Sequence, residues 1–195
     1  MARTSELHRK TRETDVQVEV NLEGRGDASV ETGVGFFDHM LELLARHSLV
    51  DLKVRARGDL QVDPHHTVED VGLTLGAAIL QALGDKRGIT RYGHFTLPMD
   101  EVLVTVAIDF SGRSVLVADL PFRSPVIGTF PSELVEEFLR ALANAAKVNL
   151  HVRTLANGNS HHLAEAVFKA LGRALRMAVA VDPREPGVPS TKGSL

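Results

Sequence analysis

Apolar and polar residues follow two different periods along this chain, and these periods predict its secondary structure. Strict alternation is typical of half-buried strands, whereas apolar residues three to five positions apart are typical of a helix packed on one face. In the first half the patterns predict strands at 16–22 and 28–34, a helix at 36–48, a strand at 51–57 and a helix at 64–83. The long helix ends at Gly84, where glycine relieves the strain of a left-handed cap. The first two strands are expected to form a hairpin around residues 24–26.

The same order of elements returns in the second half. Strands are predicted at 102–110 and 113–120, followed by a helix at 131–147, a strand at 148–155 and a helix at 161–179. When the sequence is shifted by 96 positions, residues 65–82 align with residues 161–178 at eight identities, which include two His-His doublets. Farther upstream, a shift of 88 aligns Glu13 with Glu101.

This repetition predicts an α+β fold built from a duplicated ββαβα unit. Each unit alone has too little core to be stable, so the two are expected to pack around a pseudo-twofold axis as two sheets with the helices between them. The two long helices are expected to be neighbours. The repeats are expected at residues 1–90 and 91–181, and the proline-containing residues 182–195 form a tail that cannot continue the last helix.

Composition removes several classes of protein. Hydrophobic residues make up 44% of the 195 positions and charged residues 24%, which is typical of a globular protein. The net charge of -3 argues against nucleic acid as a partner, and the absence of cysteine excludes disulfides, thiolate metal sites and cysteine nucleophiles. No apolar run has transmembrane length and the polar start lacks a secretory signal, so a cytoplasmic location is expected.

Histidine is the unusual residue, because an identical His-His doublet begins each predicted long helix. In the segments HHTVE (65–69) and HHLAE (161–165) the first histidine and the glutamate are four residues apart, so each pair shares a helical face and can chelate one ion. Adjacent residues lie about 100° apart on a helix and cannot close on the same ion. The doublets therefore predict two metal ions, with His66 and His162 each reaching the ion held by the other repeat. One doublet alone is as often a solvated or capping pair.

A second kind of candidate ligand precedes the doublets. His39 coincides with Glu137 when the repeats are aligned with a shift of 98, and both are metal-ligand types. The predicted sets are His65, Glu69, His162 and Glu137 for one ion, and His161, Glu165, His66 and His39 for the other; some ligands can come from a neighbouring subunit. Nitrogen and carboxylate donors suit Mn, Fe, Co, Ni or Zn equally well. The alternative for Glu137 is a surface glutamate.

Basic residues suggest an anionic substrate. Arg91, Arg113, Lys169 and Lys192 can supply charged donors to a phosphate group. The alternative is that each is a solvated surface charge and that the tail is disordered.

The motifs FFDHM, HHTVED, GDKRGI, LPMDE, HHLAEA with FKALGRAL, and PSTKG occur in this order along essentially the whole chain. In this combination the chain resembles the imidazoleglycerol-phosphate dehydratases of histidine biosynthesis. The resemblance implies a ribosomal-protein-S5-domain-2-like fold, an octahedral 24-subunit homo-oligomer, and two Mn²⁺ ions per subunit in active sites built at subunit contacts.

The resemblance also assigns roles to individual residues. It supports every predicted metal ligand except Glu137, where family members commonly have histidine. It implies catalytic roles for Glu13, Glu165, His47 and Asp100, and substrate phosphate or polar contacts for Arg91, Arg113, Lys169, Ser190 and Lys192.

The implied reaction removes water from D-erythro-imidazole-glycerol phosphate to give imidazole-acetol phosphate. The carbon that loses its proton has no neighbouring carbonyl, so two Lewis-acidic ions on the imidazole ring would stabilise an imidazolate as the electron sink. Glu165 or Glu13 would move the carbon proton. Two alternatives remain: a dinuclear metallohydrolase acting on a phosphorylated small molecule, and a non-catalytic assembly that stores metal.

Overall fold

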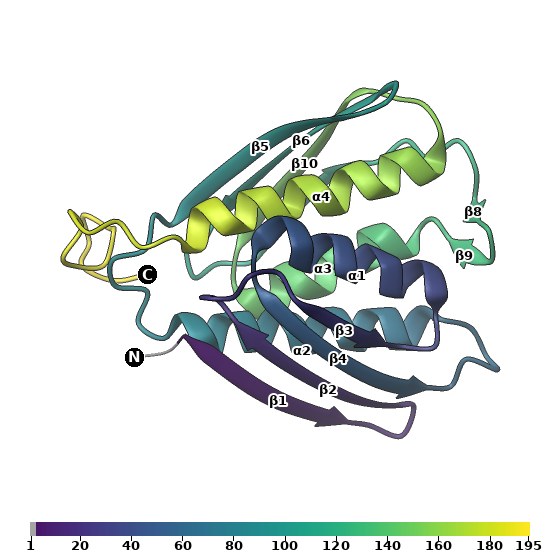
Figure 1. Ribbon diagram of the computed structural model, residues 1–195, viewed down its shortest axis with the longest axis horizontal. Coiled ribbons are helices and arrows are strands. Elements are labelled where there is room, and N and C mark those ends of the chain that lie inside the picture. The colour runs from purple at the N-terminus through teal and green to yellow at the C-terminus, as the bar shows by residue number, and fades with distance from the viewer. Residues whose placement is uncertain (1–2) are drawn as a thin grey trace.

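Two four-stranded sheets enclose four helices in the computed structural model, which describes residues 3–195 (Figure 1). The first repeat supplies β1 (Thr4–Lys10), β2 (Thr14–Asn21), β3 (Ala28–Glu31), α1 (Gly35–Ser48), β4 (Asp51–Gly58) and α2 (His65–Leu83). The second supplies β5 (Tyr92–Met99), β6 (Val102–Asp109), β7 (Val115–Asp119), α3 (Leu134–Ala146), β10 (Asn149–Ala156) and α4 (Ser160–Val179), with a short ribbon of β8 (Val126–Ile127) and β9 (Phe130–Pro131) before α3. The predicted α+β fold, with helices between two sheets, is confirmed. The first two residues of the predicted 1–90 repeat lie outside the described residues.

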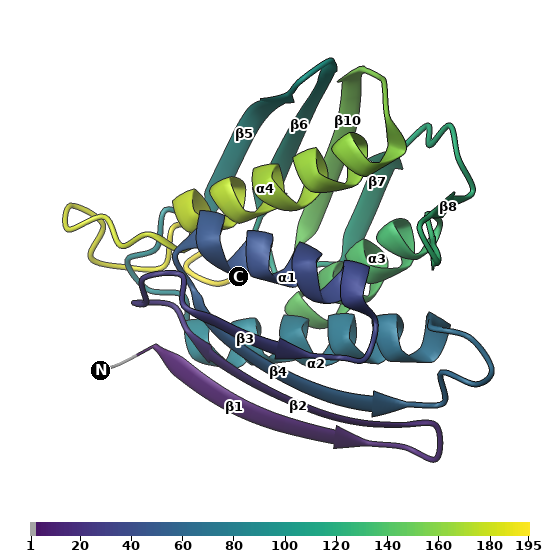
Figure 2. The same ribbon diagram turned by 45° about the vertical axis from the view of Figure 1, so that its right-hand side comes forward.

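The duplication extends to the pairing of individual residues. The strand order is β1-β2-β4-β3 in the first sheet and β5-β6-β10-β7 in the second (Figure 2). Arg9 pairs with Val16 across β1 and β2, and Leu97 pairs with Val104 across β5 and β6, so both pairs are related by the shift of 88. The two halves therefore have equivalent registers as well as equivalent element orders.

Each repeat contains one strand more than predicted, so the unit is βββαβα. The additional strands, β1 and β5, form one edge of each sheet. Side chains of β1 alternate between exposed and half-buried, and Leu7 is its one apolar residue. An edge strand that buries so little needs few apolar residues, which explains why the hydrophobic pattern did not indicate it.

The predicted hairpin between the second and third strands is wrong. β2 pairs antiparallel with both β1 and β4, whereas β3 lies on the far side of β4 and pairs parallel with it. The connection therefore crosses the end of β4. There, Oδ1 of Asp51 accepts hydrogen bonds from the amides of Arg25, Gly26 and Asp27 at 2.7, 3.1 and 3.1 Å. The glycines of this segment serve a crossover rather than a tight turn.

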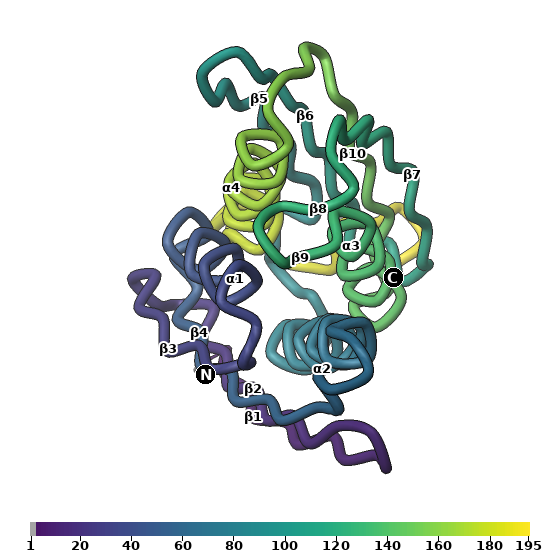
Figure 3. Tube along the Cα trace, turned by 90° about the vertical axis from the view of Figure 1, so that its right-hand side faces the viewer, coloured from purple at the N-terminus to yellow at the C-terminus, as the bar shows by residue number. Residues whose placement is uncertain are grey.

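The prediction that the two long helices are neighbours is also wrong. α2 packs on α3, and α4 packs on α1, so each long helix covers the shorter helix of the other repeat (Figure 3). Gly76 of α2 and Gly172 of α4, which are equivalent residues, lie where these helices approach closely. A Cβ atom at Gly76 would lie 2.6 Å from the carbonyl oxygen of Leu142, and one at Gly172 would lie 2.9 Å from that of Leu44.

Phenylalanine rings join the two halves at the centre of the helical layer. Phe37 of α1 lies edge-on to Phe138 of α3 at 5.4 Å between ring centroids, and Phe138 stacks on Phe168 of α4 at 5.2 Å. All three side chains are at most 1% exposed. The core is therefore shared by both repeats, as expected for units that are too small to bury their own helices.

Residues 182–195 contain no helix or strand. Residues 182–195 fold back beside the start of β5, where Nη1 of Arg91 donates to the carbonyl of Pro189 at 2.9 Å and the amide of Gly88 donates to that of Gly187 at 2.9 Å. Within residues 3–195 the helices are too short or too polar to cross a membrane.

Candidate functional site

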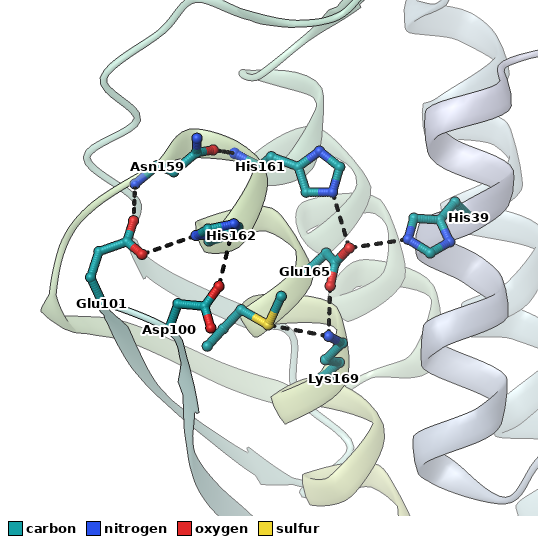
Figure 4. Close-up of polar contacts among 9 residues, drawn as sticks. His39, Asp100, Glu101, Asn159, His161, His162, Glu165 and Lys169 are labelled. Atoms are coloured by element: carbon teal, nitrogen blue, oxygen red, sulfur yellow. Dashed lines mark hydrogen bonds and ion pairs between the residues drawn. The ribbon is translucent and has the colours of Figure 1, made fainter.

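An imidazole and carboxylate cluster forms where α1 and α4 pack together. Nε2 of His39 lies 3.2 Å from Oε1 of Glu165, and Nε2 of His161 lies 3.0 Å from the same oxygen (Figure 4). His161 and Glu165 are one helical turn apart, as their spacing predicted, while His39 comes from the other repeat. Nζ of Lys169 donates to Oε2 of Glu165 at 2.6 Å. The swapped packing of the helices is what brings these groups together.

Glu165 is the charged centre of this cluster. Its side chain is 11% exposed, and burial alone raises its pKa. The hydrogen bonds from Lys169, His39 and His161 outweigh burial and lower the pKa to about 2. The group is therefore an ionised acceptor at neutral pH.

The donor atoms of this cluster fit a metal ion. His39, His161 and Glu165 each offer one ligand atom, and these atoms lie within 4.8 Å of one another. Two imidazole nitrogens and one carboxylate oxygen suit a divalent ion of the first transition series. The exposed part of the His39 and His161 side chains, 44% and 45%, leaves the cluster open on one side.

A second cluster surrounds His162 at the turn between β5 and β6. Nδ1 of His162 lies 3.0 Å from Oε2 of Glu101, and its Nε2 lies 3.6 Å from Oδ2 of Asp100. Glu101 also accepts the amide of Asn159 at 2.5 Å. The hydrogen bond with Glu101 raises the pKa of His162. The hydrogen bonds from the Asn159 amide and from His162 lower the pKa of Glu101 to about 2.

Glu101 was absent from the predicted site. The signal that could have identified it is its alignment with Glu13, since the equivalent turn of the first repeat carries a predicted site residue. There, Nδ1 of His66 lies 3.9 Å from Oε2 of Glu13 and 3.0 Å from Oδ2 of Asp59, another residue that the sequence did not indicate. The hydrogen bond to Asp59 raises the pKa of His66.

The structure assembles one predicted ligand set in part and leaves the other apart. Three of the four groups expected around one ion, His39, His161 and Glu165, meet in one chain, while His66 pairs with Asp59 instead. Among residues 3–195, the ligand clusters contain none of the half-buried His65, Glu69 and Glu137, and His162 contacts Glu101 rather than these groups.

The predicted phosphate residues lie mainly around one cavity of about 840 Å³ formed by the tail, β5 and the turn after β6. Arg91, Arg113, Ser190 and Lys192 line it. Arg91 is also paired with Asp109, at 2.7 Å from Nε to Oδ1, and this hydrogen bond raises its pKa. Lys169 lies elsewhere, beside Glu165.

His47, a predicted catalytic residue, lies on α1 about two helical turns after His39. It is half-buried, and burial, reinforced by the charges of Lys169 and Arg173, lowers its pKa. An imidazole in that position is neutral at physiological pH.

Known proteins are similar in sequence to this chain over almost its whole length. The family model described as imidazoleglycerol-phosphate dehydratase matches residues 32–175. The imidazoleglycerol-phosphate dehydratase of Polaromonas sp. is 57% identical over 194 residues, covering 99% of this chain and 94% of the relative. That of Methylorubrum extorquens is 59% identical over 194 residues, covering 99% and 100%.

Solved structures agree with the fold. The crystal structure of the enzyme from Staphylococcus aureus superposes with a TM-score of 0.84 at 36% identity, covering 92% of this chain and 99% of that one. The crystal structure of the enzyme from Pyrococcus furiosus, in complex with (S)-C348, gives a TM-score of 0.84 at 35% identity, covering 97% and 100%.

Fold and site together define a class, that of internally duplicated α+β proteins in which imidazoles and carboxylates converge from paired helices. The sequence comparisons then give the family. This chain belongs to the imidazoleglycerol-phosphate dehydratase family, a family of hydro-lyases in histidine biosynthesis, which confirms the resemblance in its motifs.

Proposed function

We propose that this enzyme converts D-erythro-imidazole-glycerol phosphate to imidazole-acetol phosphate and water with the help of two Mn²⁺ ions. The observation that carries the proposal is the cluster of His39, His161 and Glu165, an open nitrogen and oxygen donor set in a member of this family. A cytoplasmic location is part of the same proposal.

The metal ligands are proposed in two sets. One ion would be held by His161, Glu165, His39 and His66, and the other by His65, Glu69, Glu137 and His162. Such ions, when bound, act as Lewis acids on the imidazole ring of the substrate. Because each described cluster contains only part of a set, the missing ligands are proposed to come from a neighbouring subunit in a 24-subunit assembly.

Glu13 is the better candidate to take the carbon proton. The carboxylate of Glu165 is already engaged by three side chains, those of His39, His161 and Lys169. It is therefore assigned to metal binding and to the ion pair with Lys169. The Glu13 side chain is 55% exposed and approaches His66 only to 3.9 Å, so its carboxylate can reach a bound substrate.

Asp100 is proposed to supply a proton to the leaving hydroxyl, and His47 is proposed to assist beside it. The Asp100 side chain is 70% exposed at the tip of the β5–β6 turn, next to His162. A proton moved to the departing hydroxyl completes the loss of one water molecule.

The phosphate of the substrate is proposed to bind in the tail cavity. Arg113, Ser190 and Lys192 supply donors, and Arg91 fixes the tail by its bond to Pro189. Lys169 lies midway along α4, in its ion pair with Glu165, and the tail follows the end of that helix, so the Lys169 that meets the phosphate is proposed to come from a neighbouring subunit. Charged donors that hold a remote phosphate orient the reacting carbon.

The test uses the full chain stripped of metal, with Mn²⁺ added back. The expected result is imidazole-acetol phosphate formed only with metal and without inorganic phosphate, together with a smaller particle on size-exclusion chromatography after chelation. Release of inorganic phosphate would indicate a metallohydrolase, and absence of turnover with every divalent ion would refute the proposal. His161→Ala serves as the variant that should lose both activity and one bound ion.

A further inference from the structure

Glu13 and Glu101, the two glutamates equated by the repeat alignment, are held in different ways. Oε1 of Glu101 accepts the Asn159 amide at 2.5 Å, and its Oε2 lies 3.0 Å from Nδ1 of His162. Among residues 3–195, the carboxylate of Glu13 makes one polar contact, the 3.9 Å approach to His66. Glu101 is therefore used to fix its own turn, whereas Glu13 is not.

The turn that carries Glu13 is fixed by other side chains. Oγ1 of Thr11 accepts the amides of Glu13 and Thr14 at 3.1 and 2.9 Å. Oγ1 of Thr14 donates to Oδ2 of Asp70, and Nη2 of Arg9 lies 3.0 Å from Oδ1 of the same carboxylate. Asp70 lies on α2 and is 5% exposed, so a buried acid ties the turn to the helix that bears the first doublet.

The second repeat has apolar residues at the three equivalent positions. By the shifts of 88 and 96, Arg9, Thr14 and Asp70 correspond to Leu97, Val102 and Ala166. Val102 and Ala166 are 1% and 0% exposed, so this apolar version is well packed. Replacing a buried ion pair by apolar residues is often neutral or stabilising. The fold therefore does not require the three polar residues of the first repeat.

We propose that Asp70 is the positioning residue for Glu13. By holding Thr14 and Arg9, it fixes the β1–β2 turn and leaves the Glu13 carboxylate unengaged, ready to take a proton from the substrate. The inference rests on the role proposed above for Glu13. In the second repeat the glutamate itself fixes the turn, so the two copies of one ancestral position have divided the tasks of structure and proton transfer.

The test replaces the polar residues by those of the second repeat, in the variant Arg9→Leu, Thr14→Val and Asp70→Ala. Its thermal midpoint and metal content are expected to match those of the parent, because the same packing exists in the other half. Its kcat should fall about 10²-fold, the usual cost of a reacting group displaced by about 1 Å, with KM changed by less than about twofold. Amide hydrogen exchange at Glu13 and Thr14 should become faster.

A matched control is Thr74→Val. It removes the 2.6 Å hydrogen bond from Thr74 to the backbone carbonyl of Asp70 and leaves the turn untouched. It should keep the parent kcat and the parent exchange rates in the turn. Unchanged exchange at Glu13, or a parent kcat in the triple variant, would overturn the inference.

A double-mutant comparison shows whether Asp70 acts through Glu13. In a Glu13→Gln background the triple change should lower kcat no further, because the group that it positions is already gone. A second loss of the same size would overturn the inference. If Glu13→Gln alone keeps the parent kcat, the proposed role of Glu13 fails first; if Glu13→Gln is slow and the triple variant is not, only the inference about Asp70 fails.

Discussion

One residue distinguishes the two proposed metal sites, because α1 presents His39 where α3 presents Glu137. Glu137 is half-buried on a helix that packs against α2, which bears His65 and Glu69. Glu137→Ala is expected to retain about one of two ions per chain, measured by elemental analysis after desalting, while Glu137→His should keep both and weaken the preference for Mn over softer ions.

The neighbouring Glu136 offers the control for this prediction. It forms an i,i+4 ion pair with Arg140 on the exposed side of α3, so Glu136→Ala should keep both ions. Two ions in Glu137→Ala would mean that the residue is not a ligand and that the alignment of His39 with Glu137 has no chemical meaning.

Asp51 holds the crossover between β2 and β3 through a single oxygen. Partial burial raises its pKa, but the amides of Arg25, Asp27 and Gly26 and the side chain of Asn21 together lower it below the ordinary 3.8. Because the folded pKa is depressed, this stabilisation is complete above about pH 4 and is lost as the pH falls through the folded value.

Removing that acceptor leaves three amides unpaired. Asp51→Ala is expected to lower the free energy of unfolding by about 1–3 kcal/mol at pH 7, whereas Asp51→Asn, which keeps an oxygen, should lose less. The difference between parent and Asp51→Ala should shrink when chemical denaturation is repeated near pH 3. A difference that grows toward acid would contradict the assignment.

Single residues were predictable from the sequence where spacing alone fixes geometry. His161 and Glu165 meet because four residues complete about one helical turn. The equivalent positions of the two His-His doublets in the repeats indicated that both belong to the site. Asp59 and Glu101 were missed because they lie in turns, whose position beside a histidine is set by tertiary packing rather than by local period.

At the scale of elements, the helix pairs depend on glycine. A Cβ at Gly76 would lie 2.6 Å from the Leu142 carbonyl and 2.9 Å from Cβ of Ala145, so Gly76→Ala must separate α2 from α3. We expect a loss of about 1–3 kcal/mol in the free energy of unfolding, read as a lower thermal midpoint.

Gly35, at the start of α1, is the matched control, since a Cβ there would meet nothing within 4 Å. Gly35→Ala should be neutral or slightly stabilising, because alanine favours helix more than glycine does. Equal midpoints for Gly76→Ala and Gly35→Ala would mean that the helix contact is looser than described.

Elements were largely predictable, but their partners were not. Periodicity shows which side of a strand or helix is apolar, and every predicted helix exists at nearly its expected bounds. It does not show which other element covers that side. For this reason the hairpin and the contact between the long helices were wrong, although the segments themselves were correctly placed.

At the scale of the whole molecule, the tail completes the cavity proposed for the phosphate. Deleting residues 189–195 should raise KM at least about tenfold and change kcat less, because donors to the phosphate bind the substrate and its transition state alike. The thermal midpoint should change little, since the deleted residues belong to no part of the core.

Two point variants refine this prediction. Lys192→Ala should reproduce much of the rise in KM, whereas Arg184→Ala should not, because Arg184 is 88% exposed and pairs with Asp182 in its own segment. An unchanged KM in the deletion would leave the tail without a role in binding.

The packing of each long helix on the shorter helix of the other repeat has a consequence for the synthesis of the chain on the ribosome. The apolar face of α1 is covered only when α4, roughly a hundred residues later in the sequence, has been synthesised. In the same way, α2 is covered only after α3 has been made. At translation rates of about 5–20 residues per second, α1 remains uncovered for on the order of ten seconds. A nascent chain therefore exposes the apolar faces of α1 and α2 while its second half is still being made. This is the stage of synthesis at which the chain should most need chaperones.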